Sequence, residues 1–201
     1  MLTQRLPAEL TGKWNHNTHY YPLALDAVPC RRALDVGCGD GLLLRLLAPH
    51  CNEVVGVDPW ADLAVSATRD LANVEVRNGD FLETDLAAQS FDLVTSIAAI
   101  HHMDFDRALT KMASLVRPGG RLVVVSIADY SNRLDWALSG LAIPAHRYSA
   151  WRRGYWDHPA PVRDCELSYR QVRAAVGRIL PGATYRRRLY WRYSITWTRL
   201  A

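Results

Sequence analysis

The stretch "LDVGCGDG" at residues 34–41 places Gly37, Gly39 and Gly41 at alternate positions between an apolar run and a leucine-rich segment. A strand, a tight glycine loop and a helix in this order are typical of nucleotide cofactor sites, because glycine lets the backbone approach a ligand closely. The dinucleotide fingerprint of dehydrogenases needs a third small residue at position 42, where this chain has Leu42. The loop therefore indicates an adenosine-containing cofactor and weakens the case for nicotinamide.

Two acidic residues downstream could bind the polar groups of such a cofactor. Asp58 ends the run "VVGVD", where a carboxylate can accept hydrogen bonds from both hydroxyls of a ribose. Asp80, in "NGDF", could accept a hydrogen bond from an adenine amino group while Phe81 or a neighbour packs on the ring. Each acid alone is more often a helix cap, but together with Asp35 behind a glycine loop they favour a ligand site.

Histidines offer a second kind of chemistry. His101 and His102 follow the apolar run "FDLVTSIAAI", and an unperturbed imidazole titrates near ~6.5, so either is a candidate general base. The alternative is that the pair holds the following helix in place. His16 and His19 are three residues apart, but no nearby Asp, Glu or Cys completes a metal site, so no metal is expected.

The elements that must position these residues follow an alternating rhythm. From Arg32 onward, β-rich runs alternate with helical patterns, which is typical of a parallel sheet wrapped by helices. Helical spacing predicts helices around 60–71 and 105–115, and Ser168 with Gln171 predicts a capping box before another helix. Strands are expected over 33–36, 53–57, 74–77, 91–97, 121–127, 184–190 and 193–200.

The predicted fold is therefore α/β, a single doubly wound and mostly parallel seven-stranded sheet with an antiparallel last strand and helices on both faces. The last two strands are separated by only two or three residues, which requires an antiparallel hairpin. A chain of 201 residues fits one domain of ordinary size. No segment approaches the ~20 apolar residues of a membrane-spanning helix, and the first residues lack a leader pattern.

The four cysteines lie far apart without a C-x-x-C spacing, which favours reduced thiols and a cytoplasmic protein. They are Cys30, Cys38, Cys51 and Cys165. The charge is divided unevenly, because residues 1–129 have a net charge of −5 and residues 130–201 a net charge of +9. A basic, aromatic part such as "RYSAWRRGYW" suits nucleic acid or an acidic substrate, and the alternative is a solvated arginine surface.

Five sequence motifs together resemble those of a known protein family. They are "ALDVGCGDG", "GVDP", "NGDF", "SFDLVTSIAAIHHM" and "LVRPGGRLVVV". With these motifs in this order, the chain resembles a class I, Rossmann-like S-adenosylmethionine-dependent methyltransferase of the small-molecule type, similar to methyltransferase types 11 and 25. The resemblance implies methyl transfer with S-adenosyl-L-methionine as the cofactor.

The resemblance also implies roles for single residues. The glycines would approach the methionine part of the cofactor, and Asp35 would orient the loop and the cofactor's ammonium group. Ribose, adenine and the amino-acid moiety would be held by residues that end the next three strands, and the alternative for Ile97 to Ile100 is that they only fill the core. Independently of the resemblance, the stretch "WNHNTHYYP" predicts a segment that closes over the cofactor, with Tyr20 or Tyr21 touching it or the substrate, and the alternative is plain aromatic packing. The expected cofactor-binding residues are Asp35, Gly37, Gly39, Gly41, Asp58, Pro59, Asp80, Phe81, Ile97 and Tyr21.

The single methyltransferase domain, 1–201, divides into four expected parts. Residues 1–29 form the lid segment, 30–129 the cofactor-binding core, 130–167 a substrate-covering insertion with a helix around 132–141, and 168–201 the terminal helix and hairpin. The insertion is long for a compact domain, which suggests that it covers a site.

The methyl acceptor is less well specified. Enzymes that methylate base amino groups or glutamine often have an Asn/Asp-Pro-Pro-aromatic motif where this chain reads "IAAIHH". This difference, and the lack of an appended RNA-binding domain, favour a hydroxyl, amine or carbon of a small metabolite. The alternatives are an RNA-modifying enzyme that uses the basic C-terminal part and a non-catalytic S-adenosylmethionine-binding protein. The sequence fixes neither the acceptor nor the oligomeric state.

Overall fold

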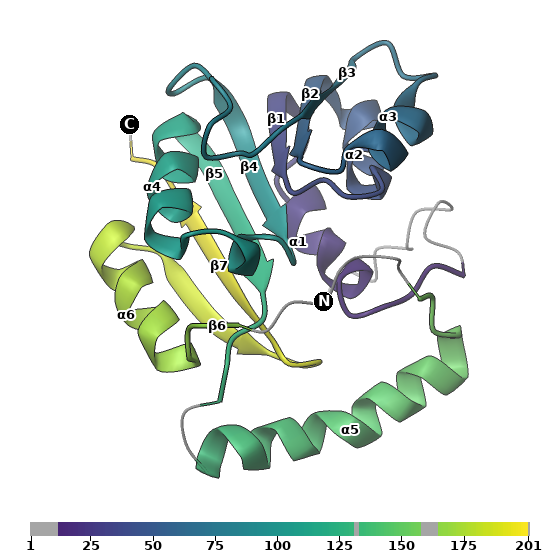
Figure 1. Ribbon diagram of the computed structural model, residues 1–201, viewed down its shortest axis with the longest axis vertical. Coiled ribbons are helices and arrows are strands. Elements are labelled where there is room, and N and C mark those ends of the chain that lie inside the picture. The colour runs from purple at the N-terminus through teal and green to yellow at the C-terminus, as the bar shows by residue number, and fades with distance from the viewer. Residues whose placement is uncertain (1–11, 131–132, 158–164, 201) are drawn as a thin grey trace.

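The computed structural model describes residues 12–130, 133–157 and 165–200, and this part of the chain folds around one seven-stranded sheet (Figure 1). The strand order is β3-β2-β1-β4-β5-β7-β6. The strands are β1 Cys30–Val36, β2 Cys51–Asp58, β3 Val74–Asn78, β4 Phe91–Ile97, β5 Val116–Ser126, β6 Thr184–Arg188 and β7 Arg192–Thr198. The helices are η2 Thr18–Tyr20, α1 Tyr21–Leu25, α2 Leu42–Leu47, η3 Ala48–His50, α3 Asp62–Thr68, η4 Ile100–His102, α4 Phe105–Leu115, α5 Arg133–Arg153 and α6 Tyr169–Ile179.

The pairing of the strands confirms the predicted fold class. Strands β3, β2, β1, β4 and β5 are parallel to one another, whereas β7 runs antiparallel to both β5 and β6. The predicted capping box of Ser168 and Gln171 is present at the start of α6. The chain order reverses direction between β1 and β4, and open sheets of this kind bind ligands at the carboxyl ends of the strands beside such a switch point.

The sheet is buried on both faces by helices. Leu34 and Val36 of β1 point into a cluster that includes residues of α4 and α6, such as Leu109 and Val172. The neighbouring Ala33 points the other way, into a cluster with residues of α1 and α2. This alternation is the period of two expected of a strand, and it explains why the strands are almost continuously apolar.

The start of β5 differs from the expectation. The segment "RPGG" was expected to separate a helix from a strand beginning at Arg121, but β5 begins at Val116, directly after α4. Phe91 pairs with Val116 and Leu93 with Arg121, so the residues between form a bulge. A Cβ at Gly120 would lie 2.9 Å from the carbonyl oxygen of Asp92, which explains the need for glycine.

The insertion contains a longer helix than expected. Residues 132–141 were expected to be helical, and residue 132 lies outside the described part, but α5 extends from Arg133 to Arg153. Figure 1 shows α5 lying across the edge of the sheet toward which β4 and β5 point. The turn between β6 and β7 holds it there, because the Ser149 and Tyr190 hydroxyls lie 2.8 Å apart and Trp191 Nε1 donates to the Ser139 carbonyl at 3.2 Å.

An aromatic cluster joins the N-terminal segment to this helix and turn. His16 Nε2 lies 2.9 Å from His146 Nδ1 of α5, and the His16 ring stacks on Tyr190 with centroids 5.3 Å apart. Trp14 is buried against the same Tyr190, at 5.4 Å. The cluster comprises Trp14, His16, Tyr20, His146, Tyr155, Tyr190 and Trp191. His16 is therefore paired with His146, far away in the sequence, and not with His19.

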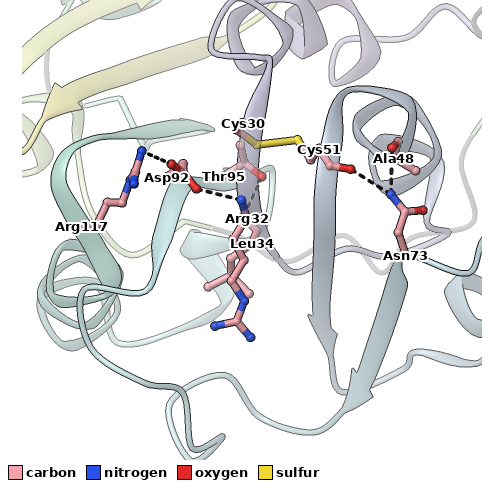
Figure 2. Close-up of a disulfide and its surroundings, with 9 residues drawn as sticks. All are labelled: Cys30, Arg32, Leu34, Ala48, Cys51, Asn73, Asp92, Thr95 and Arg117. Carbon is pink, nitrogen blue, oxygen red and sulfur yellow. Dashed lines mark hydrogen bonds and ion pairs between the residues drawn. A yellow bond between two sulfur atoms is a disulfide. The ribbon is translucent and has the colours of Figure 1, made fainter.

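A disulfide joins Cys30 to Cys51, so the expectation that all four cysteines are reduced is wrong for this pair (Figure 2). The two residues are opposite each other at the start of β1 and β2, with Cα atoms 4.8 Å apart. Parallel pairing brings together cysteines 21 residues apart in the sequence, a proximity that no local spacing indicates. The pairing removes the reduced-thiol argument for a cytoplasmic location, and Cys38 is a buried free thiol.

The ends of the strands around the disulfide are tied by side chains, as Figure 2 shows. Asn73 donates to the carbonyls of Ala48 and Cys51, both at 2.9 Å. Asp92 accepts from the Arg32 amide at 2.8 Å and forms an ion pair with Arg117. Within the described ranges, no helix has both the length and the apolar character needed to cross a membrane.

Replacing Cys51 with serine is expected to lower the free energy of unfolding by about 3 kcal/mol, because the cross-link restricts the unfolded chain. Denaturant titrations without reductant measure this difference, and it should vanish when both proteins are reduced. The matched control is Cys165→Ser, which leaves the disulfide intact. Equal stability of wild type and Cys51→Ser under oxidising conditions would contradict the prediction.

The stability of the protein is expected to fall as the pH drops from 6.5 toward 4 because of His16. Burial, followed by the charge of Arg192 and the neighbouring His146 and His19, lowers the pKa of His16 from 6.5 to about 4. Between these pH values the unfolded chain binds a proton on His16 that the folded chain does not bind, so acid favours the unfolded state. Thermal melts at several pH values should show a smaller acid-induced loss in His16→Gln than in wild type. A control is the exposed His50→Gln, and an equal loss in His16→Gln and wild type would refute the prediction.

Candidate functional site

A cavity of about 340 Å³ opens at the carboxyl ends of β1, β2 and β4, beside the switch point of the sheet. Its size lies within the range of small-ligand sites. The lining comes from the glycine loop after β1, the acid that ends β2, the turn after β4 and the N-terminal segment. The structure therefore brings together most of the elements that were expected to hold a cofactor.

The glycine loop packs between the end of β2 and the turn after β4. Gly37 has a φ of +75° and donates to the Val57 carbonyl at 2.8 Å, and a Cβ at this position would lie 2.1 Å from Cβ of Ala99. Gly37 and Gly39 line the cavity, whereas Gly41 precedes α2 as its N-cap with a φ of +76°. Gly41 thus lets the chain turn into α2, and it does not line the cavity.

Hydrogen bonds hold the side chain of Asp58 against this loop. Its side chain is buried, and its two oxygens accept from the amides of Gly39 at 2.9 Å and Trp60 at 2.8 Å. A carboxylate oxygen has a second lone pair, so both can still accept from hydroxyl groups in the cavity. Pro59 is exposed and does not line the cavity, but Trp60, 69% exposed, does.

Asp35 lies beneath the loop and outside the cavity wall. It accepts a hydrogen bond from Thr95 Oγ1 at 2.7 Å, and it is only 3% exposed. Burial raises the pKa of Asp35 from 3.8 to about 7, against the opposing effect of the Thr95 bond. Its carboxyl is thus held inside the fold by Thr95, and Asp35 does not line the cavity.

The expected adenine contacts are placed differently. Phe81 is 1% exposed, packs in the core and has Lys111 Nζ at 5.1 Å from its ring centroid. The ring of Phe81 is thus part of the core, and a role of this residue beside adenine stays a prediction. Asp80 is exposed beyond the cavity lining and accepts from the Leu82 amide at 2.7 Å. Trp60 is the exposed ring beside Asp58.

The N-terminal segment and the end of β4 supply the opposite wall. Tyr21 lines the cavity, and burial followed by Asp40 and Asp35 raises the pKa of its phenol, which keeps it protonated as a donor. Ile97 also lines the cavity, next to Ala98, whose φ of 59° is unusual for a residue with a side chain. Both expected residues, Tyr21 and Ile97, are therefore placed at the site.

His101 and His102 stand between this cavity and a second one of about 970 Å³. Both side chains line both cavities, together with Ile127, and their rings are 4.0 Å apart. His101 Nδ1 lies 2.9 Å from Oγ of Ser126, a fully buried residue at the end of β5. The second cavity lies between η4, the start of α4, and α6.

Several lining residues had no recognisable signal in the sequence. Asn15, Asn17, Tyr155, Asp157 and Arg192 reach the first cavity from three separate segments. The N-terminal pair lies inside the expected lid segment, and Tyr155 inside the expected insertion. The sequence does not distinguish Arg192 from the other arginines of the basic part. Arg192 lies at the cavity because of the pairing of β6 with β7.

The arrangement suits a cofactor without phosphate groups. In phosphate-binding loops, backbone amides point at the ligand, whereas here the Gly39 amide is already bound to Asp58. The cavity offers carboxylate oxygens for hydroxyls and backbone on the Gly37 side for close approach. These residues fit S-adenosylmethionine, whose ribose hydroxyls and amino-acid end need such acceptors and donors.

Comparisons with known proteins agree with this geometry. The family model described as "Methyltransferase domain" matches residues 34–124. The chain is 37% identical over 196 residues to the uncharacterized methyltransferase Rv0089 of Mycobacterium tuberculosis, which covers 92% of this chain and 96% of that protein. It is 35% identical over 142 residues to a ubiquinone biosynthesis O-methyltransferase of Rhizobium etli, covering 68% of this chain and 56% of that protein.

A solved structure shows the same fold. The N-methyltransferase NodS from Bradyrhizobium japonicum WM9, in complex with S-adenosyl-L-homocysteine, matches with a TM-score of 0.63 and 18% identity. The match covers 98% of this chain and 93% of that chain. Since a relative of more than one-third identity extends over nearly the whole length, the chain belongs to the class I, Rossmann-like family of S-adenosylmethionine-dependent methyltransferases.

Proposed function

We propose that this methyltransferase acts on a small molecule, which binds where the two cavities meet. The supporting observation is that His101 and His102 line both the cofactor cavity and the larger neighbouring one. A volume of about 970 Å³ is within the range of small-ligand pockets. The name of the Rhizobium etli relative, a ubiquinone biosynthesis O-methyltransferase, supports a small acceptor as well.

In this proposal each wall of the first cavity has a separate task. Asp58 accepts from the ribose hydroxyls, the backbone at Gly37 and Gly39 approaches the methionine part, and Tyr21 donates from the N-terminal side. Trp60 takes the role of an adenine neighbour in place of Phe81, with Asp80 as a further acceptor. When bound, the cofactor supplies a methyl group on a positively charged sulfur, and holding the acceptor in line accounts for much of the rate in such displacements.

His101 is the proposed base for an acceptor hydroxyl or protonated amine. When its Nδ1–H donates to Ser126 Oγ, the other ring nitrogen has a lone pair that can take the acceptor's proton. The bond to Ser126 fixes the orientation of the ring at the junction of the cavities. His102 is proposed to pack against His101, and their ring centroids are 4.0 Å apart.

The RNA alternative has less support, because several arginines of the basic part make internal contacts. Arg187 forms an ion pair with the buried Asp135 and lies 4.0 Å from the ring centroid of Tyr169. Arg199 donates to backbone carbonyls at 3.2 Å, and Arg188 donates to Ser194 at 2.8 Å. The positive charge of this part is therefore used in folding as well as on the surface.

Replacing Asp58 with asparagine is expected to weaken S-adenosylhomocysteine binding by about tenfold or more, since an acceptor oxygen and a charge are lost. Calorimetric titration measures the affinity, and thermal melts check that the protein remains folded. Asp62→Asn, an exposed change at the start of α3, is the matched control and should bind normally. Asp80→Asn in the same assay tests the proposed adenine contact. Normal binding by Asp58→Asn would rule out the ribose role.

Labelled S-adenosylmethionine offered with an RNA-free metabolite extract tests both the acceptor class and the base. Wild type should transfer label to a small molecule, and not to bulk tRNA. His101→Gln is expected to lower kcat by about 100-fold or more while it still binds S-adenosylhomocysteine, because proton removal is lost. Ser126→Ala should lower kcat less and change the acidic limb of the pH profile.

His102→Gln is the matched control for this experiment and should keep most of the activity. Undiminished turnover by His101→Gln would exclude it as the base. Label in tRNA, with none in small molecules, would overturn the proposed acceptor class and favour RNA.

A further inference from the structure

Arg192, the first residue of β7, brings a positive charge to the cofactor cavity. One terminal nitrogen donates to Asn17 Oδ1 at 2.9 Å, and the other lies 3.4 Å from the Tyr190 carbonyl. Its Nε is shielded from solvent and has no hydrogen-bond partner. The guanidinium is thus held at the cavity by neutral groups and retains unused donor capacity.

The described residues provide no counter-ion for this arginine. The titratable groups that act on it include the phenols of Tyr169, Tyr155 and Tyr20, the thiol of Cys165 and the imidazole of His16, and burial lowers its pKa. Asp157 lines the same cavity, but no ion pair joins it to Arg192 within the described part of the chain. A partly buried cation without an ionic partner costs free energy, and an oxyanion in the cavity would offset this cost.

We propose that the methyl acceptor carries an oxyanion, a carboxylate or a phosphate, and that Arg192 binds this group. The proposal rests on the proposed function, since it specifies the small molecule that occupies the site. A guanidinium matches both oxyanions, because its parallel N–H groups can donate to two oxygens at once. The oxyanion serves as an anchor, and the atom that receives the methyl group lies elsewhere on the acceptor, toward His101.

The position of Arg192 in the sheet favours the acceptor over the cofactor's own carboxylate. Strands β4 and β5 separate β7 from β1, so at about 4.8 Å per strand Arg192 starts about 14 Å along the sheet from the strand that precedes the glycine loop. Asp58 lies still farther away, after β2. Tyr193, the next residue, pairs with Ser126, the partner of His101. Arg192 and His101 also line the same cavity.

Aromatic side chains around this end of the cavity suggest which probes to use. His16 and Tyr155 line the same cavity with rings 5.5 Å apart, and both approach from segments that cover the sheet edge. Benzoate and phenyl phosphate present an oxyanion on a flat ring, and benzamide has nearly the same shape as benzoate without the charge. The three compounds therefore separate charge recognition from ring packing.

Calorimetric titration of the S-adenosylhomocysteine-loaded protein with these probes tests the proposal. At least one of the two oxyanions should bind wild type about tenfold or more tightly than benzamide, as expected for a charge-assisted hydrogen bond. Arg192→Gln should abolish this preference, and Arg192→Lys should keep part of it. Arg186→Gln removes the same charge from an exposed position of β6 and should behave as wild type.

A second titration identifies the source of the oxyanion. Arg192→Gln is expected to bind S-adenosylhomocysteine within about twofold of wild type, since Arg192 then makes no bond to the cofactor. If the variant loses affinity for S-adenosylhomocysteine but not for 5′-methylthioadenosine, which lacks the amino-acid end, Arg192 holds the cofactor carboxylate and the proposal is wrong. Equal binding of all three probes to wild type would also overturn it, and this comparison does not depend on whether the variant folds.

These titrations need no turnover, so they are independent of the methyl-transfer assay. If the protein methylates only RNA but still binds the oxyanion probes through Arg192, the proposed small-molecule function is wrong. The anion site at Arg192 would then still be supported. Methylation of neutral small molecules with no oxyanion preference would overturn this inference alone.

Discussion

The close approach of Gly37 to Ala99 is the constraint on which the rest of the site depends. A side chain at position 37 would overlap Ala99, so the glycine loop after β1 can lie directly against the turn after β4 only because Gly37 has no Cβ. That turn continues into η4, which includes His101 and His102. One backbone contact thus sets the distance between the cofactor loop and the residues proposed to act on the acceptor.

A second layer of the site is built from segments far apart in the chain. The N-terminal segment, α5 and the turn between β6 and β7 meet in the aromatic cluster, and the Arg192 to Asn17 bond joins residues 175 positions apart. Tyr190 and Trp191 both have positive φ values in this turn, near 56° and 57°. Contacts from both sides therefore hold a backbone conformation that bulky residues rarely adopt.

The sheet and its cofactor loop could be predicted from the sequence because their signals are local. Apolar runs, the glycine spacing and the Ser168 capping box are each read within a few residues, and the structure confirms the elements that they predict. The pairing of Cys30 with Cys51 depends on which strands are neighbours, and so does the position of Arg192. The sequence does not show to which side the ring of Phe81 turns after its strand, and the structure places that ring in the core.

The way in which α5 is attached has a consequence for the local stability of the protein. The sheet is held by continuous ladders of backbone hydrogen bonds, whereas the described part of α5 is joined to it through side chains such as Ser149, His146 and Asp135. Elements with few such bonds open locally at a lower free energy than the core. The contacts between α5 and the β6–β7 turn are therefore expected to open at a lower free energy than the strand pairs of the sheet, so local unfolding would begin at this helix.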